Sequence, residues 1–124
     1  MTKREILIIP LFAFPVMQVQ LDLDSEKLTE FAFEMQNKNK KGVLRTNKGG
    51  WQSDDINKEK HEEFVRLKKE ITQHVQTYQS EVFQGMEFKK NITLSTHGMW
   101  VNINEKQHYN DWHIHGFAIL SGVY

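Results

Sequence analysis

Two histidines, His113 and His115, are separated by a single residue near the end of this sequence. On an extended chain, residues two apart point to the same side, so the two imidazoles can share one metal ion. Metal–nitrogen bonds are about 2.0–2.1 Å long, so Asp111, two residues earlier, would rarely reach the same ion. We expect Asp111 to accept a hydrogen bond from an imidazole N–H, or to be a turn residue. His97 and His108 are the other histidines that remain available as donors nearby.

The spacing alone leaves the occupant of this histidine pair open. Iron and zinc both accept imidazole nitrogen, and a pair of ordinary histidines without a metal is the alternative reading. Thiolate sites and disulfides are excluded because the chain has no cysteine. There is no Gly-rich phosphate loop, and Ser121-Gly122 does not form the nucleophile elbow of a hydrolase.

Two amphipathic helices are predicted upstream of the pair. In the first, Leu28, Phe31, Ala32 and Met35 recur at the spacing of one helix face, with Ser25 as the predicted N-cap. Lys40-Lys41-Gly42 reads as the end of this helix.

The second predicted helix spans roughly Lys58–Val82 and ends near Gly85. Its apolar face consists of Phe64, Leu67, Ile71, Val75, Tyr78 and Val82. His61 and His74 lie within this span, and we expect them to be ordinary surface or boundary residues.

The remaining segments suggest extended chain. Ile6–Phe14 is predicted as a strand at an edge or a break because it contains Pro10. Between the helices, Gly49-Gly50 allows a sharp turn, and we expect Trp51 beside it to cover the core rather than to bind a ligand. After Gly85 the apolar period changes to two, with one face of a strand formed by Ile92, Leu94 and Thr96.

A second alternating run leads toward the histidines. Its aliphatic face should pack on the helices and contains Met99, Val101 and Ile103. Its other face should line a polar space and contains Trp100, Asn102 and Asn104. A further extended run is predicted from about Trp112. The predicted order is a strand, two helices and then further strands. This order favours the α+β class, in one domain covering residues 1–124.

Composition narrows the kinds of partner. The 124 residues contain sixteen Lys plus Arg and sixteen Asp plus Glu, so the formal net charge is zero. This balance gives no overall attraction to nucleic acid or to an anionic membrane. No apolar run approaches the ~20 residues of a membrane helix, and Pro10 and Pro15 interrupt the only stretch similar to a signal peptide. We therefore expect a soluble, cytoplasmic protein.

Several segments, in this order, resemble a family of 2-oxoglutarate/Fe(II)-dependent oxygenases from bacteria and from phages of marine cyanobacteria. The similar segments are Pro10–Val16, Gly49–Ser53, Met99–Asn104, His113-Ile114-His115 and Leu120–Tyr124. The sequence departs from the family at Asp111-Trp112 and at Gly116-Phe117, where the family usually has proline next to the histidines.

The resemblance implies a double-stranded β-helix (jelly-roll) sheet, present here in part, with the two amphipathic helices packed on it. It implies Fe(II) held by His113 as first ligand and His115 as second, in place of the more common carboxylate. It further implies a 2-oxoglutarate pocket faced by Asn102 and Asn104, with Tyr124 as another pocket residue, and hydroxylation of a substrate that the sequence does not identify.

The family's distal histidine, and the basic residue that pairs with 2-oxoglutarate, fall beyond Tyr124. We therefore expect a truncated N-terminal part of such a jelly-roll, with impaired or absent activity. The alternative from another functional class is a non-catalytic binding or assembly module that self-associates, as a homo-oligomer, through an open strand edge. A small zinc-binding protein ranks third, because no further ligand is apparent.

Overall fold

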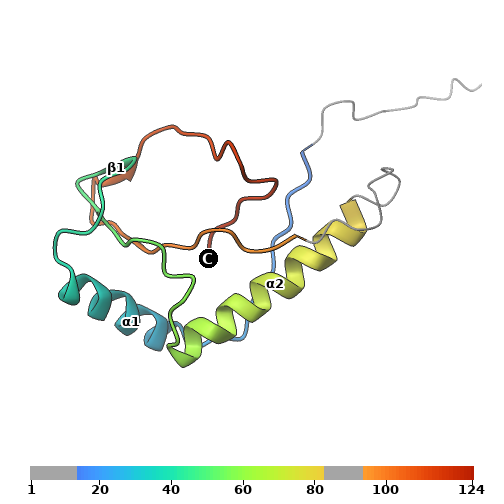
Figure 1. Cartoon of the computed structure of the whole chain (residues 1–124), viewed down its shortest axis with the longest axis horizontal. Helices are drawn as coiled ribbons and strands as arrows, with labels where there is room; N and C mark the ends of the chain where they lie inside the picture. The colour runs from blue at the N-terminus through green and yellow to red at the C-terminus, as the bar shows by residue number, and fades with distance from the viewer. Residues whose placement is uncertain (1–13, 83–93) are drawn as a thin grey trace, which may run out of the picture.

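Figure 1 shows the computed structural model, which describes residues 14–82 and 94–124. The predicted strand at Ile6–Phe14 lies outside these residues except for Phe14, and so does the predicted helix end near Gly85. The described elements are α1 (Ser25–Lys38), β1 (Asn47–Lys48), β2 (Trp51–Gln52), α2 (Glu62–Val82), β3 (Asn102–Ile103) and β4 (Tyr109–Asn110).

The N-cap of helix α1 lies one residue earlier in the sequence than predicted. The N-cap is Asp24, whose carboxylate accepts the backbone N–H of Lys27 at 3.1 Å, so the prediction of Ser25 as the cap was wrong. An aspartate serves this position well because its charge also faces the positive end of the helix. At the other end, the Asn39 N–H is bonded to the Met35 carbonyl, and the chain leaves the helix before Lys40.

Helix α2 begins at Glu62, four residues later than the predicted Lys58. The reason is Ile56, which is buried in the core and is followed by a turn in which the Glu59 N–H is bonded to the Ile56 carbonyl at 2.9 Å. The first helical bond then runs from the Val65 N–H to the His61 carbonyl. Because Ile56 is buried before the helix begins, α2 is shorter than the sequence pattern predicts.

The two helices meet at their N-terminal ends and form a V (Figure 1). Glu63 of α2 joins them: its buried carboxylate accepts the Asp24 N–H at 2.7 Å and both 2.9 Å bonds from the Arg66 guanidinium. The Asp24 N–H bond, and then Arg66, hold the pKa of Glu63 below its usual range. Arg66 also donates to the Asp22 carbonyl at 3.2 Å, which fixes the chain that enters α1.

The hydrophobic core lies where these elements converge. Phe31 of α1, Phe64 and Leu67 of α2 and Ile56 are its buried members. Partly buried side chains from the rest of the chain complete it: Leu21, Leu23, Leu28, Met35, Ile71, Met99 and Val101. Met99 and Val101 are in this group, so the predicted aliphatic face of the second alternating run is confirmed for these two residues.

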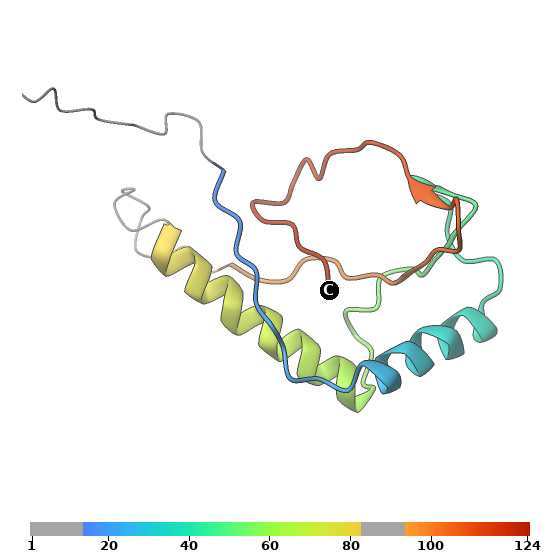
Figure 2. The same ribbon diagram turned by 180° about the vertical axis from the view of Figure 1, so that it is seen from behind.

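The strands form two antiparallel ladders on the open side of the V (Figure 2). In one ladder Asn47 pairs with Asn110 and Lys48 with Tyr109; in the other Trp51 pairs with Ile103 and Gln52 with Asn102. The chain passes from the first ladder to the second through Gly49-Gly50. Gly49 has a φ of +82°, and a Cβ there would collide with the ring of His108, so glycine is required at this turn.

Trp51 is buried, as expected, although it packs beside the end of α1 rather than within the central core. Its indole Nε1 donates to the Asn39 carbonyl at 2.8 Å. Residues 94–96, predicted as a strand together with Ile92 outside the described part, are not in a ladder. The α+β class is confirmed, with small two-stranded antiparallel ladders. Neither described helix combines the length and apolar character needed to cross a lipid bilayer.

Phe64→Ala should lower the free energy of unfolding by about 3–5 kcal/mol, because it empties a site in the core where the ring is only 2% exposed. Val65→Ala on the same helix is the matched control, since Val65 is 48% exposed, and it should cost much less. Urea denaturation followed by circular dichroism measures both. Equal losses would contradict the placement of the core.

Glu63→Gln should remove part of the pH dependence of stability. A carboxylate whose folded pKa is lowered stabilises the fold above its unfolded pKa, about 4.3, and loses this contribution as the pH falls through the folded pKa. The variant should therefore be less stable than the parent at pH 7, with the difference shrinking as the solution becomes acidic. Unfolding curves across this pH range test it; a constant difference would contradict the linkage.

Candidate metal centre

His113 and His115 lie side by side with both rings exposed. Their ring centroids are 4.8 Å apart and the ring planes make an angle of 76°. Two imidazoles that share one ion through bonds of about 2.1 Å have centroids roughly 4.6–5.3 Å apart for bond angles near 90–110°. The separation of the rings is therefore compatible with one shared ion, and the expectation that the two side chains share a side is confirmed.

The hydrogen bond of His113 defines which of its nitrogens can bind a metal. Its Nδ1 lies 2.7 Å from the backbone carbonyl oxygen of Asp111, and a carbonyl can only accept, so Nδ1 must carry the proton. In the neutral imidazole this leaves the lone pair on Nε2. A backbone carbonyl bonded to the other ring nitrogen is the usual arrangement that fixes the tautomer of a ligating histidine.

The backbone and the side chain of Asp111 both fix the start of the segment that contains His113 and His115. Its N–H donates to the Thr46 carbonyl at 2.8 Å, which continues the β1–β4 ladder, and its carboxylate pairs with Lys48 at 3.2 Å. We expected the Asp111 side chain to accept from an imidazole N–H, but the atom 2.7 Å from His113 Nδ1 is the main-chain oxygen of Asp111. The Asp111 carboxylate is directed to Lys48, on the neighbouring strand β1.

Trp100 forms a wall beside the pair. Its indole ring lies 5.7 Å from the ring of His115 at an interplanar angle of 30°. Trp100 is held in place by its neighbours: the Met99 N–H donates to the Asp55 carboxylate at 3.2 Å and the Val101 N–H donates to Ser53 Oγ at 2.9 Å. The N–H donors of Asn57 and then Met99 lower the pKa of Asp55, so this anchor stays charged.

Asn102 and Asn104, the predicted pocket residues, are exposed and alternate with buried or half-buried neighbours, as expected. On an extended segment they share a face with Trp100, and Trp100 contacts His115. Asn104 also reaches across to β4, where its Nδ2 lies 3.4 Å from Asn110 Oδ1. The third predicted pocket residue is elsewhere: the Tyr124 hydroxyl lies 3.3 Å from Ser25 Oγ at the start of α1.

The extended run predicted from Trp112 is not a regular strand. Among the described residues its backbone has no ladder partner, and the Ala118 N–H turns back to the His115 carbonyl at 2.9 Å. Within residues 14–82 and 94–124, no group of three or more His, Cys, Asp or Glu side chains comes together. Among the described residues, the candidate centre therefore consists of the two imidazole rings alone.

The other histidines lie apart from the pair. His61 stacks on Phe31 at 4.5 Å in the core region, and His74 lies 3.8 Å from Glu70 on α2. His97 is exposed near Asp55. The expectation of ordinary surface or boundary residues holds for His74 and also for His61, which is half-buried.

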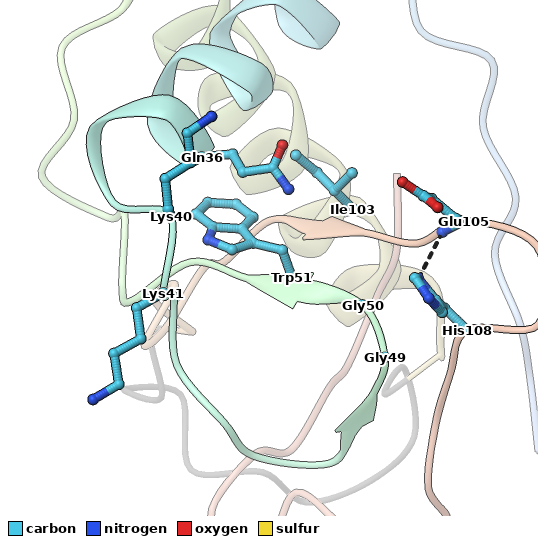
Figure 3. A pocket seen from close by; sticks show the side chains of 9 residues that line it. All are labelled: Gln36, Lys40, Lys41, Gly49, Gly50, Trp51, Ile103, Glu105 and His108. Atoms are coloured by element: carbon cyan, nitrogen blue, oxygen red, sulfur yellow. Dashed lines mark hydrogen bonds between the residues drawn. The ribbon is translucent and has the colours of Figure 1, made fainter.

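His108 lines a cavity of about 310 Å³ between the end of α1 and the β1–β2 turn (Figure 3). Its Nδ1 accepts the Glu105 N–H at 3.0 Å, so it is not free to join the metal pair through that atom. Lys40, Lys41 and Trp51 also border the cavity. Sequence reasoning did not identify this cavity; the signal for it was Gly49-Gly50 beside an aromatic residue.

Comparison of the chain with protein-family models, with curated proteins and with solved structures finds no match in any of the three. The oxygenase resemblance therefore depends on the sequence segments alone.

The two bonded histidines should show opposite tautomers. His113 donates from Nδ1 to a carbonyl, whereas His108 accepts at Nδ1 from a backbone N–H, so its proton must be on Nε2. Long-range ¹H–¹⁵N correlation spectra at a pH where both rings are neutral should find the Nδ1–H form for His113 and the Nε2–H form for His108. The same tautomer at both positions would contradict the geometry of the candidate centre.

Proposed function

We propose that this chain is a cytoplasmic 2-oxoglutarate/Fe(II)-dependent oxygenase that hydroxylates its substrate, with its ladders belonging to a double-stranded β-helix. The observation that carries the proposal is the pair of exposed, adjacent imidazoles at His113 and His115, 4.8 Å apart, with the His113 tautomer fixed by Asp111. The similarity of the sequence segments to that family supports iron rather than zinc.

In this proposal His113 Nε2 and a ring nitrogen of His115 hold the iron. Fe(II) with open positions supplies the oxidative chemistry when it is bound together with 2-oxoglutarate and O₂. The protein's own contribution is to fix the two rings, through the Asp111 carbonyl and through Trp100.

Asn102 and Asn104 are proposed to face 2-oxoglutarate because they share a face with Trp100, which contacts His115. Their amide groups can donate to carboxylate oxygens of the keto acid. Tyr124 has weaker support, since its hydroxyl is directed to Ser25, so its part in the pocket depends on the sequence resemblance alone.

The proposal predicts that metal binding requires both histidines of the pair. Equilibrium dialysis under argon should give one Fe(II) per chain, with His113→Ala and His115→Ala each weakening binding by at least about a hundredfold because each removes a ligand. His97→Ala is the matched control, since it removes an exposed histidine outside the pair and should leave the affinity unchanged. Adding 2-oxoglutarate to the iron-loaded chain then tests whether the chain also binds the keto acid, which the charge-transfer absorption band of the chelate reports.

The outcomes separate the candidate functions. Metal bound equally well by His113→Ala and by the parent would contradict the site. Zn(II) binding without any 2-oxoglutarate-dependent band would favour a zinc-binding protein. A chain that takes up neither metal and forms oligomers would favour a non-catalytic binding or assembly module.

A further inference from the structure

The segment from Trp112 to Val123 exposes large apolar side chains to water. Trp112, Phe117 and Val123 are fully exposed, Ile114 is 90% exposed, and Ile119 is exposed for most of its surface. We call these five side chains the 112–123 surface. Single exposed apolar residues are ordinary on a protein, but a set of five within twelve consecutive residues indicates a contact surface.

The backbone of the same segment is available for pairing. Among the described residues, the only backbone–backbone hydrogen bond within residues 112–123 joins the Ala118 N–H to the His115 carbonyl. Unpaired backbone N–H and C=O groups on an apolar segment can be bonded by the backbone of another chain.

The 112–123 surface is distinct from the metal pair. His113 and His115 are turned toward each other and toward Trp100. Trp112 and Ile114 are almost completely exposed, so neither side chain is packed against the two rings. A partner can therefore cover the apolar side without displacing the two imidazoles, and the inference holds whether or not a metal is bound.

Charge and area indicate which partner fits. No Asp, Glu, Lys or Arg occurs between Trp112 and Tyr124, so two copies of this segment can meet without like-charge repulsion. Burying two aromatic and three aliphatic side chains removes on the order of 500–850 Å² from water per copy. That range reaches the roughly 800 Å² per partner of a stable interface.

We infer that two copies of this chain associate through the 112–123 surface, in an isologous dimer in which the same segment of each copy meets the other. The dimer buries Trp112, Ile114 and Phe117 and pairs the free backbone groups of the segment. Because the contact is isologous, a single substitution in the chain alters both sides of the interface.

Sedimentation velocity in the presence of EDTA tests this inference with one matched pair of variants. Ile114 is 90% exposed and Leu44, outside the segment, is 86% exposed, so lysine at either position leaves the folded chain unstrained. The parent and Leu44→Lys should double their mass with rising concentration. Ile114→Lys should raise the dimer dissociation constant by at least about a hundredfold, because two apolar contacts are replaced by two like charges.

Hydrogen exchange provides a second measurement. The amides of residues 112–117 should be protected in the dimer and exchange freely in Ile114→Lys, while circular dichroism confirms that the variant is folded. A parent chain that stays monomeric at every concentration would overturn the inference, as would growth beyond a dimer. Ile114→Lys that dimerises as well as Leu44→Lys would overturn it too.

Discussion

The structure depends on the antiparallel contact between residues 51–56 and residues 99–103. The β2–β3 ladder is only two residue pairs long, but it is extended by the Ser53 N–H bonded to the Val101 carbonyl and the Ile56 N–H bonded to the Met99 carbonyl. Buried Ser53 adds a side-chain bond to the Val101 N–H, and Asp55 adds one to the Met99 N–H. This contact attaches the last quarter of the chain to the helices, so the positions of Trp100 and of the histidines follow from it.

The helices form the other fixed part, and they are joined by one charged group together with the hydrophobic core. Glu63 accepts from the backbone of Asp24 and from Arg66, and the aromatic core of Phe31 and Phe64 lies beside it. A buried carboxylate is costly unless its oxygens are satisfied, and here three hydrogen bonds, one from the Asp24 N–H and two from Arg66 Nη1, satisfy them. The junction therefore fixes where the V opens, and the ladders occupy that opening.

The helices were predictable because their information is local. The recurrence of Phe31 and Met35, and of Phe64 and Leu67, defines each buried face without reference to distant residues. Their starts were less predictable, since Asp24 competes with Ser25 as a cap and the burial of Ile56 delays α2. The ladders were not predictable, because strands of two residues carry almost no periodic signal and their register is set by partners about fifty residues away.

The candidate site also combines features that the sequence predicts with features that it does not. The shared side of His113 and His115, and the exposed face of Asn102 and Asn104, follow from alternation along the chain. Three features do not: the use of the Asp111 carbonyl in place of its carboxylate, the contact of Trp100 with His115, and the direction of Tyr124 toward Ser25. The contacts of Trp100 and Tyr124 are long-range, and the Asp111 carboxylate is paired with Lys48, which is distant in the sequence, so no local pattern encodes these features.

The central claim is that two imidazoles one residue apart converge on a single ion. X-ray absorption of the chain loaded with one equivalent of Fe(II) under argon measures this directly. The account predicts two imidazole nitrogens at about 2.0–2.1 Å, the bond length known for such ligands, with the remaining positions filled by oxygen. A spectrum with one imidazole or none would contradict it.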